Sequence, residues 1–67
     1  MPIHLKAARV NAGLTQQEAA AAVGVSKGTL RNYETYKTKP DIETSKRLAK
    51  LYGLTVDGII FCNSSVL

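Results

Sequence analysis

The sequence has few of the features that stabilise a small domain from outside its hydrophobic core. Its 67 residues include one cysteine, Cys62, and no tryptophan. One cysteine cannot form an internal disulfide, and no group of cysteines and histidines has the spacing of zinc ligands. We therefore expect no structural metal, no cofactor, and a reduced, partly buried Cys62 thiol in a cytoplasmic protein. The single histidine, His4, is expected at the surface.

Long hydrophobic runs are also missing. The longest nearly uncharged apolar stretch, residues 19–26, is too short to span a bilayer. The first six residues lack the long apolar region of a signal peptide. The sequence also shows no paired-carboxylate site, no glycine-rich phosphate loop and no nucleophile–base set. These absences argue against a membrane protein, against an enzyme and against a small-molecule substrate.

The length predicts a single domain spanning residues 1–67, because a chain this short lies near the lower limit for folding on one core. Such a domain buries only about 60% of the surface that its unfolded chain exposes, so a partner subunit is expected to add stability. Apolar residues near the C-terminus exceed what a small core can cover and predict a homodimer interface. They are Val56, Ile59, Ile60, Phe61, Val66 and Leu67.

Positive charge is in excess and unevenly distributed. Nine Lys and Arg residues against five Asp and Glu residues give a formal net charge of +4. The excess lies in residues 1–39 and is greatest in residues 27–39, where one acidic side chain accompanies the basic ones. A concentrated positive patch attracts nucleic acids by neutralising phosphates and releasing counterions. Charge alone fits equally well with a basic surface that only aids solubility.

Turn signals divide the chain into five helical segments, and no segment alternates convincingly as a strand would. The segments cover about residues 3–12, 16–23, 27–35, 42–52 and a short stretch after Thr55. Inward positions recur at helical spacing in the first and fourth segments. They are Leu5, Ala8 and Ala12, and then Ile42, Ser45, Leu48, Ala49 and Tyr52. The pattern predicts an all-α fold.

A very short turn joins the second and third helices. Thr15 and Glu18 have the spacing of a capping box at the start of the second helix. That helix ends at Gly24, which can adopt a positive φ, and Ser26 is a good N-cap for the next helix. A glycine followed at once by an N-cap is typical of two helices that meet steeply, as in a helix-turn-helix.

The third helix has two opposed faces. At about 100° per residue, Lys27, Arg31 and Asn32 share one face, whereas Thr29 falls on the apolar side. Those three side chains are suited to contacts with phosphates and base edges. Gly28 lies among them at a cost of about 0.5–1 kcal/mol relative to alanine. It either lets the backbone come close to a base or a sugar-phosphate edge, or is a tolerated surface glycine.

These motifs together resemble the Cro and lambda-type repressor family of helix-turn-helix proteins. The resemblance rests on GLTQQEAA at 13–20, VGVS at 23–26, LRNYE at 30–34, Pro40 and LYGLTVD at 51–57. It covers nearly the whole chain. It implies a compact five-helix domain that binds a palindromic operator in double-stranded DNA as a two-fold homodimer, with the second helix of each motif in a major groove.

The resemblance also implies individual DNA contacts. Gln16, at the start of the second helix, would touch a phosphate, and Lys37 and Lys39 would clamp backbone phosphates from the loop after the third helix. The groove contacts would come from Ser26, Lys27, Gly28, Thr29, Arg31 and Asn32. Lys27, at the start of the helix, could contact a phosphate or a base, and its helical angle beside that of Arg31 favours the base.

Arg9 and Glu34 fall where the family forms an internal ion pair between the first and third helices. The resemblance therefore implies a structural role for both, with a phosphate contact as the alternative for Arg9.

The chain departs from the family pattern after Glu34, where Thr35 and Tyr36 replace a usual glycine. We therefore expect a different exit from the third helix.

The sequence thus predicts a transcriptional regulator, of the kind found as phage or prophage repressors. The alternative is a protein-interaction module of the same fold, an antitoxin or adaptor, in which DNA binding is secondary. The apolar C-terminal end could be the surface that such a module uses. An adaptor, however, has no need of Lys27, Arg31 and Asn32 on one face, followed by two lysines in the next loop.

Overall fold

The computed structural model describes residues 2–61, and this part of the chain is mostly helical. It contains four α-helices, one turn of 3₁₀ helix and a parallel pair of two-residue strands. In chain order they are β1 (Ile3–His4), α1 (Leu5–Asn11), α2 (Gln16–Val23), α3 (Lys27–Glu34), α4 (Ile42–Leu51), η1 (Val56–Gly58) and β2 (Ile59–Ile60). The expectations for Cys62, Val66 and Leu67 lie outside the described residues.

Side-chain caps fix where the helices begin. In the capping box of α2, the Glu18 amide donates to Thr15 Oγ1 at 3.1 Å, and the Thr15 amide donates to Glu18 Oε1 at 2.9 Å. The Thr15 amide, which donates to the Glu18 carboxylate, lowers the pKa of Glu18, and the Thr15 side chain lowers it further. Asp41 caps α4 by accepting from the Thr44 amide at 2.8 Å. The Thr44 side chain and then this amide lower the pKa of Asp41. Gly24 ends α2 with a φ of 79°, as predicted from its position.

Large side chains from α1, α3 and α4 pack over small side chains from α2. Leu5, Leu30 and Leu48, from α1, α3 and α4, are fully buried. Ala19 and Ala20 of α2 belong to the same buried cluster. Because alanine side chains are short, they let neighbouring helices approach α2 closely. The core therefore holds α3 firmly against α2 and fixes which face of α3 points outward.

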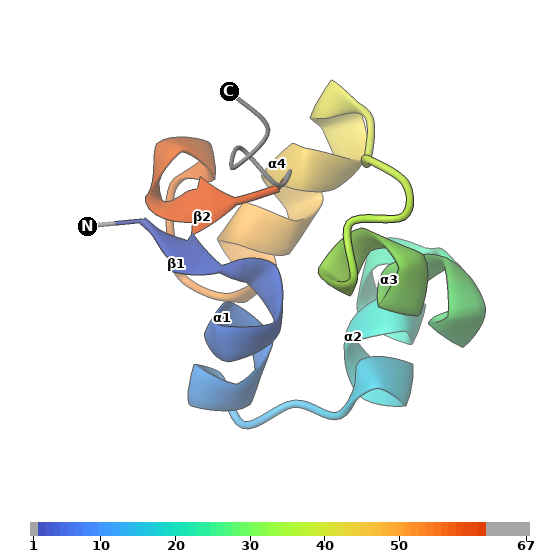
Figure 1. Cartoon of the computed structure of the whole chain (residues 1–67). Coiled ribbons are helices and arrows are strands. Elements are labelled where there is room, and N and C mark those ends of the chain that lie inside the picture. Colours follow the sequence, from blue (N-terminus) through green and yellow to red (C-terminus); the bar gives the residue numbers. More distant parts are fainter. Residues whose placement is uncertain (1, 62–67) are drawn as a thin grey trace.

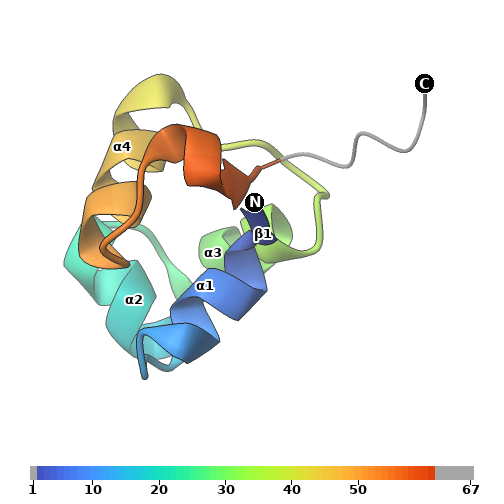
Figure 2. The ribbon, with the colours of Figure 1, turned by 90° about the vertical axis from the view of Figure 1, so that its left-hand side faces the viewer.

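The two strands tie the beginning and the end of the described chain together. Ile3 pairs with Ile59, and His4 pairs with Ile60. In Figure 1 the strands lie on the left beside α1, and α3 lies on the right beside α2. Figure 2 shows β1 running directly into α1, with the η1 turn beside the strands. The helix-turn-helix formed by α2 and α3 is thus carried on one side of the molecule.

The prediction of five helices is wrong in its last member, and the prediction that no segment forms a strand is also wrong. The fifth segment makes one 3₁₀ turn and then extends into β2. Ile3 and His4, expected in the first helix, form β1 instead. Parallel strands pair across long separations in sequence. Local periodicity therefore carries no signal for them.

Several burial predictions also need correction. Ala12 follows the last residue of α1 and is exposed, and Ile42, the first residue of α4, is 76% exposed. Both lie at helix ends, beyond the turns that cover the core. Conversely, Ile59 and Phe61, expected at a dimer interface, are buried in the core. The paired strand β2 and the residue after it turn these side chains inward.

Candidate nucleic-acid interface

The third helix, α3, buries one side and exposes the other. Leu30 and Glu34 are buried, whereas Lys27, Gly28 and Arg31 are exposed. Burial at positions four apart follows the helical repeat of 3.6 residues per turn. Leu30 lies between Lys27 and Arg31 in the sequence and packs in the core, so the two basic side chains face solvent.

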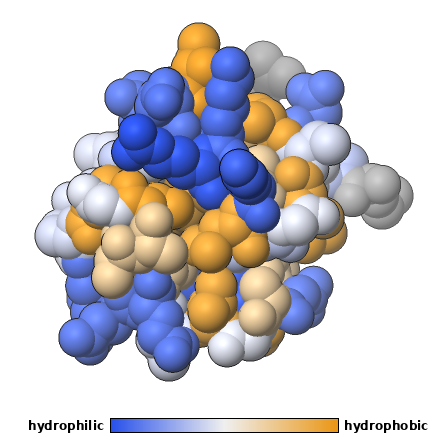
Figure 3. Space-filling view, turned by 180° about the vertical axis from the view of Figure 1, so that it is seen from behind, coloured by the Kyte–Doolittle hydropathy of each residue, from blue (hydrophilic) through white to orange (hydrophobic). Residues whose placement is uncertain are grey.

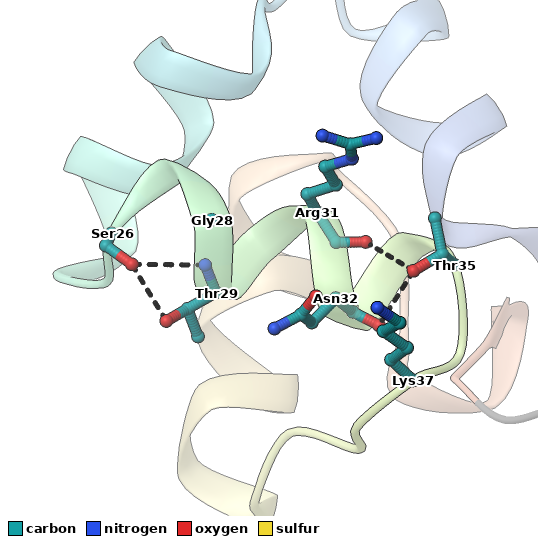
Figure 4. Close-up of a pocket in the computed structure, with 7 residues that line it drawn as sticks. All are labelled: Ser26, Gly28, Thr29, Arg31, Asn32, Thr35 and Lys37. Carbon is teal, nitrogen blue, oxygen red and sulfur yellow. Dashed lines mark hydrogen bonds between the residues drawn. The ribbon is translucent and has the colours of Figure 1, made fainter.

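The exposed side of α3 borders a hollow. We call this hollow, together with the residues that line it, the α3 face. It is lined by Ser26, Gly28, Thr29, Arg31, Asn32, Thr35 and Lys37. Figure 4 shows these residues along α3, with Arg31 and Asn32 projecting in different directions and Lys37 entering from the following loop. The structure thus brings together most of the residues predicted to contact the groove. It also places Thr35 in this hollow. Thr35 follows Arg31 by one helical turn, and this spacing could have predicted it from the sequence.

Thr29 lies in the α3 face although its helical angle predicted the apolar side. Its hydroxyl is held by the N-cap of the helix. Ser26 Oγ accepts from the Thr29 amide at 3.1 Å and donates to Thr29 Oγ1 at 2.8 Å. The same residue that begins α3 therefore positions the Thr29 hydroxyl at the edge of the hollow.

Gly28 is not required by the fold. A Cβ atom added there would meet nothing within 4 Å, and the residue has no positive φ. Neither internal packing nor backbone conformation therefore selects glycine at this position. The missing side chain changes only how closely something outside the protein can approach α3.

The loop after α3 is anchored on the end of the helix. The Asn32 carbonyl accepts from the Lys37 amide at 2.9 Å and from the Thr38 amide at 3.3 Å. This turn requires Tyr36 to adopt a φ of 64°, a region that favours glycine. The Tyr36 hydroxyl also hydrogen-bonds to Nδ1 of the exposed His4. The chain therefore leaves α3 through a backbone conformation typical of glycine, although Tyr36 occupies the position.

The two loop lysines lie in different surroundings. Lys37 borders the α3 face beside Asn32. Lys39 borders a separate hollow together with Pro40 and Ile42. The loop therefore places Lys37 beside α3 and Lys39 beside α4.

A second polar hollow, which we call the α2 hollow, lies at the N-terminus of α2. Its lining includes Gln16, Gln17 and Arg9, together with Lys27 from α3. A helix N-terminus presents backbone N–H groups and favours anions such as phosphate. Lys27 thus lies with Gln16 and not among the residues of the α3 face. Sequence reasoning missed Gln17, although its place in the first turn of α2 pointed to it.

Arg9 and Glu34 form a buried ion pair beneath these surfaces. Arg9 Nε lies 2.7 Å from Glu34 Oε2, and the two side chains are 10% and 2% exposed. Arg9 also donates to the Leu14 carbonyl at 2.9 Å, and Gln16 Nε2 donates to Glu34 Oε1 at 2.9 Å. Gln16 therefore connects the internal pair to the α2 hollow.

The positive charge of this region is left without a partner. Glu34 is the acidic residue of the basic segment 27–39, and it points inward to Arg9. Within residues 2–61 the other ion pair joins Glu43 and Arg47, both on α4. Seen from behind, the molecule shows apolar patches interrupted by hydrophilic side chains (Figure 3). The basic side chains of α3 are thus available to an anionic partner.

Two further kinds of site were sought in the described part of the chain. Residues 2–61 contain no group of three His, Cys, Asp or Glu side chains that could hold a metal ion. None of their helices is both long and apolar enough to cross a membrane.

Comparison with known proteins identifies relatives over most of the chain. The Helix-turn-helix family model matches residues 5–59. The chain is 39% identical over 56 residues to the HTH-type transcriptional regulator ImmR of Bacillus subtilis, which covers 84% of this chain and 44% of that protein. It is 38% identical over 52 residues to the cryptic phage CTXphi transcriptional repressor RstR of Vibrio cholerae, which covers 78% of this chain and 47% of that protein. No solved structure matches the chain.

The matched region contains α1 to α4 and therefore both hollows. The chain spans about half the length of the curated relatives that it matches. The resemblance seen in the sequence motifs is confirmed, and the chain belongs to the helix-turn-helix family of XRE and Cro–CI type.

Proposed function

We propose that the protein binds double-stranded DNA sequence-specifically and regulates transcription as a phage-type repressor. The observation that carries this proposal is the α3 face, where the outward side of a helix-turn-helix presents Arg31, Asn32 and Lys37 together with Gly28. A major groove admits one α-helix, and these side chains suit base edges and phosphates. Two relatives are named as transcriptional regulators, one of them a phage repressor. A DNA partner also fits a cytoplasmic location.

Within this proposal the two hollows have different tasks. Arg31 and Asn32 project from the helix that enters the groove, so they read base edges. Gln16 and Lys27 lie at the N-terminus of α2, so they hold a backbone phosphate. Gly28 lets the backbone of α3 approach the groove closely. Lys37 contacts a phosphate beside the groove.

We further propose a homodimer on a palindromic operator, formed by one domain per chain. A mostly apolar groove lies between α4 and the end of the described chain, lined by Pro40, Ile42, Val56, Ile59 and Phe61, with Lys39, Ser45 and Lys46 also in its lining. Ile42 is 76% exposed and Val56 is 38% exposed. A second copy of the chain would cover this apolar surface.

Selection of bound sequences from a random duplex library tests the proposal directly. We expect enrichment of one palindromic sequence. A library that remains unenriched, with binding that falls equally for all duplexes as salt rises, would leave only non-specific attraction to DNA. That outcome would overturn the proposed function.

A second candidate function is a protein-interaction module, and the apolar groove beside α4 favours it. In that role a different protein covers Ile42 and Val56, and DNA binding is secondary. The two functions differ in what accompanies the protein during purification. A DNA reader carries nucleic acid that high salt removes, whereas an adaptor keeps a protein partner.

A further inference from the structure

Tyr36, in the loop after α3, has a backbone conformation that suits glycine. Within residues 2–61 it alone among the non-glycine residues has a positive φ, of 64°. A side chain is strained in this region, which glycine adopts at no steric cost. Strained residues persist only where their surroundings hold them, and they gather at functional sites. The contacts of the Tyr36 side chain therefore indicate why the strain is kept.

The Tyr36 side chain reaches β1. Its hydroxyl hydrogen-bonds to Nδ1 of His4, which lies 32 positions earlier in the sequence. The two rings also lie against each other, with centroids 5.7 Å apart and planes tilted by 54°. His4 is itself fixed, since it pairs with Ile60 across the strands and precedes the fully buried Leu5. This contact, which we call the His4–Tyr36 link, ties the loop after α3 to β1.

The next residue in the loop is Lys37, which borders the α3 face. Its amide donates to the Asn32 carbonyl at 2.9 Å, so α3 holds one side of the loop. Its side chain is exposed and enters the hollow from the loop (Figure 4). Ordering a flexible side chain and the loop beneath it costs binding free energy. A loop held from two sides reduces that cost for any contact that Lys37 makes.

We propose that Tyr36 and His4 are positioning residues for DNA binding, because their link holds the loop in which Lys37 meets a backbone phosphate. The inference rests on the proposed function, in which Lys37 contacts a phosphate beside the groove. Tyr36 and His4 act through Lys37 and need not touch DNA themselves. Phosphate contacts carry no sequence information, so the link strengthens binding to every duplex and leaves base preference unchanged.

The first test removes the link from either end and leaves the backbone as it is. Tyr36→Phe deletes the hydroxyl and keeps the ring, and His4→Phe keeps a ring that lacks Nδ1. We expect each variant to weaken binding to the best duplex and to random duplexes by the same factor, roughly two- to tenfold, as for the ordering of one side chain at an interface. The double variant should bind no more weakly than either single variant, because both changes break the same link. Thermal melting checks that the fold is kept.

Tyr33→Phe is the matched control. Tyr33 is half-buried on α3 and packs against the core, and within residues 2–61 its hydroxyl has no hydrogen-bond partner. Losing this hydroxyl should leave DNA affinity unchanged. Equal weakening by Tyr33→Phe and Tyr36→Phe would show that the effect is not specific to the His4–Tyr36 link and would overturn the proposal.

The second test asks whether the link acts through Lys37. Lys37→Ala removes the phosphate contact, so adding Tyr36→Phe to it should cause no further loss of affinity. If Tyr36 only stabilises the fold, Tyr36→Phe should weaken binding by the same factor with Lys37 present or absent. Binding isotherms for the wild type, the two single variants and the double variant complete this double-mutant cycle.

The outcomes separate this inference from the proposed function. If Tyr36→Phe leaves affinity unchanged, shifts base preference, or weakens the Lys37→Ala variant as much as the wild type, the link does not position Lys37, although the protein still reads DNA through α3. If the wild-type protein shows no preference among duplexes, the proposed function fails and this inference fails with it.

Discussion

At the scale of single residues, the buried ion pair beneath the proposed DNA-binding surface allows a clear prediction. Arg9 and Glu34 are almost fully buried, so removing one partner leaves the other charge without compensation. We expect Arg9→Ala and Glu34→Ala each to lower the free energy of unfolding by about 3–5 kcal/mol. Chemical denaturation measures this loss. DNA affinity should fall only to the extent that the protein unfolds.

The second ion pair provides the control. Glu43 and Arg47 lie 3.6 Å apart on α4, with side chains that are 72% and 59% exposed. An exposed pair of this kind contributes about 0.3–0.5 kcal/mol, so Glu43→Ala should barely change stability. A variant of Arg9 that keeps its stability and loses DNA affinity selectively would instead assign Arg9 to a phosphate.

Tyr52 is a second residue whose burial has a measurable consequence. Its hydroxyl is buried, and no described residue hydrogen-bonds to it. Burial raises the pKa of Tyr52 to about 12, and the negative charge of Glu34 adds to the rise. The folded state therefore keeps Tyr52 neutral after the unfolded chain has begun to ionise, near its ordinary value of 10.0. Stability from this group is present below pH 10 and is lost between pH 10 and about 12.

Tyr52→Phe removes both the unpaired hydroxyl and its ionisation. At neutral pH we expect the free energy of unfolding to stay the same or rise by up to about 1 kcal/mol, because a buried polar atom without a partner is costly. Between pH 10 and 12 the variant should lose less stability than the wild type. Urea denaturation of the wild type and the variant at neutral pH and between pH 10 and 12 measures this difference. A large loss at neutral pH would reveal a hydrogen bond to Tyr52.

At the scale of the element, α3 combines a local weakness with its proposed task. Gly28→Ala should raise the free energy of unfolding by about 0.5–1 kcal/mol, because alanine favours a helix and the added Cβ meets nothing. The same change should weaken specific DNA binding by blocking close approach to α3. Thermal melting and binding isotherms measure the two effects. Unchanged affinity would make Gly28 a tolerated surface glycine.

Gly24 gives the opposite result with the same substitution. It also has open space around an added Cβ, but its φ is 79°. Gly24→Ala should therefore lower stability by about 1–2 kcal/mol through backbone strain alone. The two glycines show that the sign of a Gly→Ala change follows from φ when space is not limiting.

The elements with local signals could be predicted from sequence. The Thr15–Glu18 capping box and Gly24 gave the bounds of α2, and Ser26 gave the start of α3. The strands could not be predicted, because Ile3 meets Ile59 only after the chain has folded. Ile59, Ile60 and Phe61 showed only a run of apolar residues. That pattern fits a helix, a strand or an interface equally well.

The candidate site was predicted less completely than the helices that carry it. Helical angles identified the exposed side of α3, but they placed Thr29 with the apolar residues and Lys27 beside Arg31. An ideal wheel takes no account of neighbouring elements. Ser26 holds the Thr29 hydroxyl at the hollow, and the N-terminus of α2 lies beside Lys27. Such assignments depend on tertiary packing.

At the scale of the whole molecule, the apolar groove makes the proposed dimer testable. Ile42 lines the groove and is 76% exposed, so Ile42→Ser should weaken self-association without cost to the core. Val10 is 57% exposed on α1 and lies outside the residues that line the groove, so Val10→Ser is the matched control. Sedimentation at several concentrations measures the association. Equal effects of both variants, or a wild-type monomer at tens of micromolar, would reject this interface.

We expect the molecule to divide its DNA contacts between bases and phosphates. Base contacts discriminate between sequences, whereas phosphate contacts act on all DNA and make binding dependent on salt. Arg31 and Asn32 belong to the α3 face, whereas Lys27 shares the α2 hollow with Gln16. Arg31→Ala and Asn32→Ala should each reduce affinity for the best operator by about 1–3 kcal/mol and for random DNA much less.

Lys27→Ala should weaken specific and random duplexes by the same factor. It should also flatten the plot of log affinity against log salt by about one unit, or about two in a symmetric dimer. Lys37→Ala should act in the same way, and Lys39→Ala less, because Lys39 lies beside Pro40 and Ile42 in the apolar groove. Binding isotherms for both kinds of duplex at several salt concentrations decide the matter. If Lys27→Ala changes base preference and leaves the salt slope intact, Lys27 reads a base, as its helical angle had suggested. The α2 hollow would then contact DNA without Lys27.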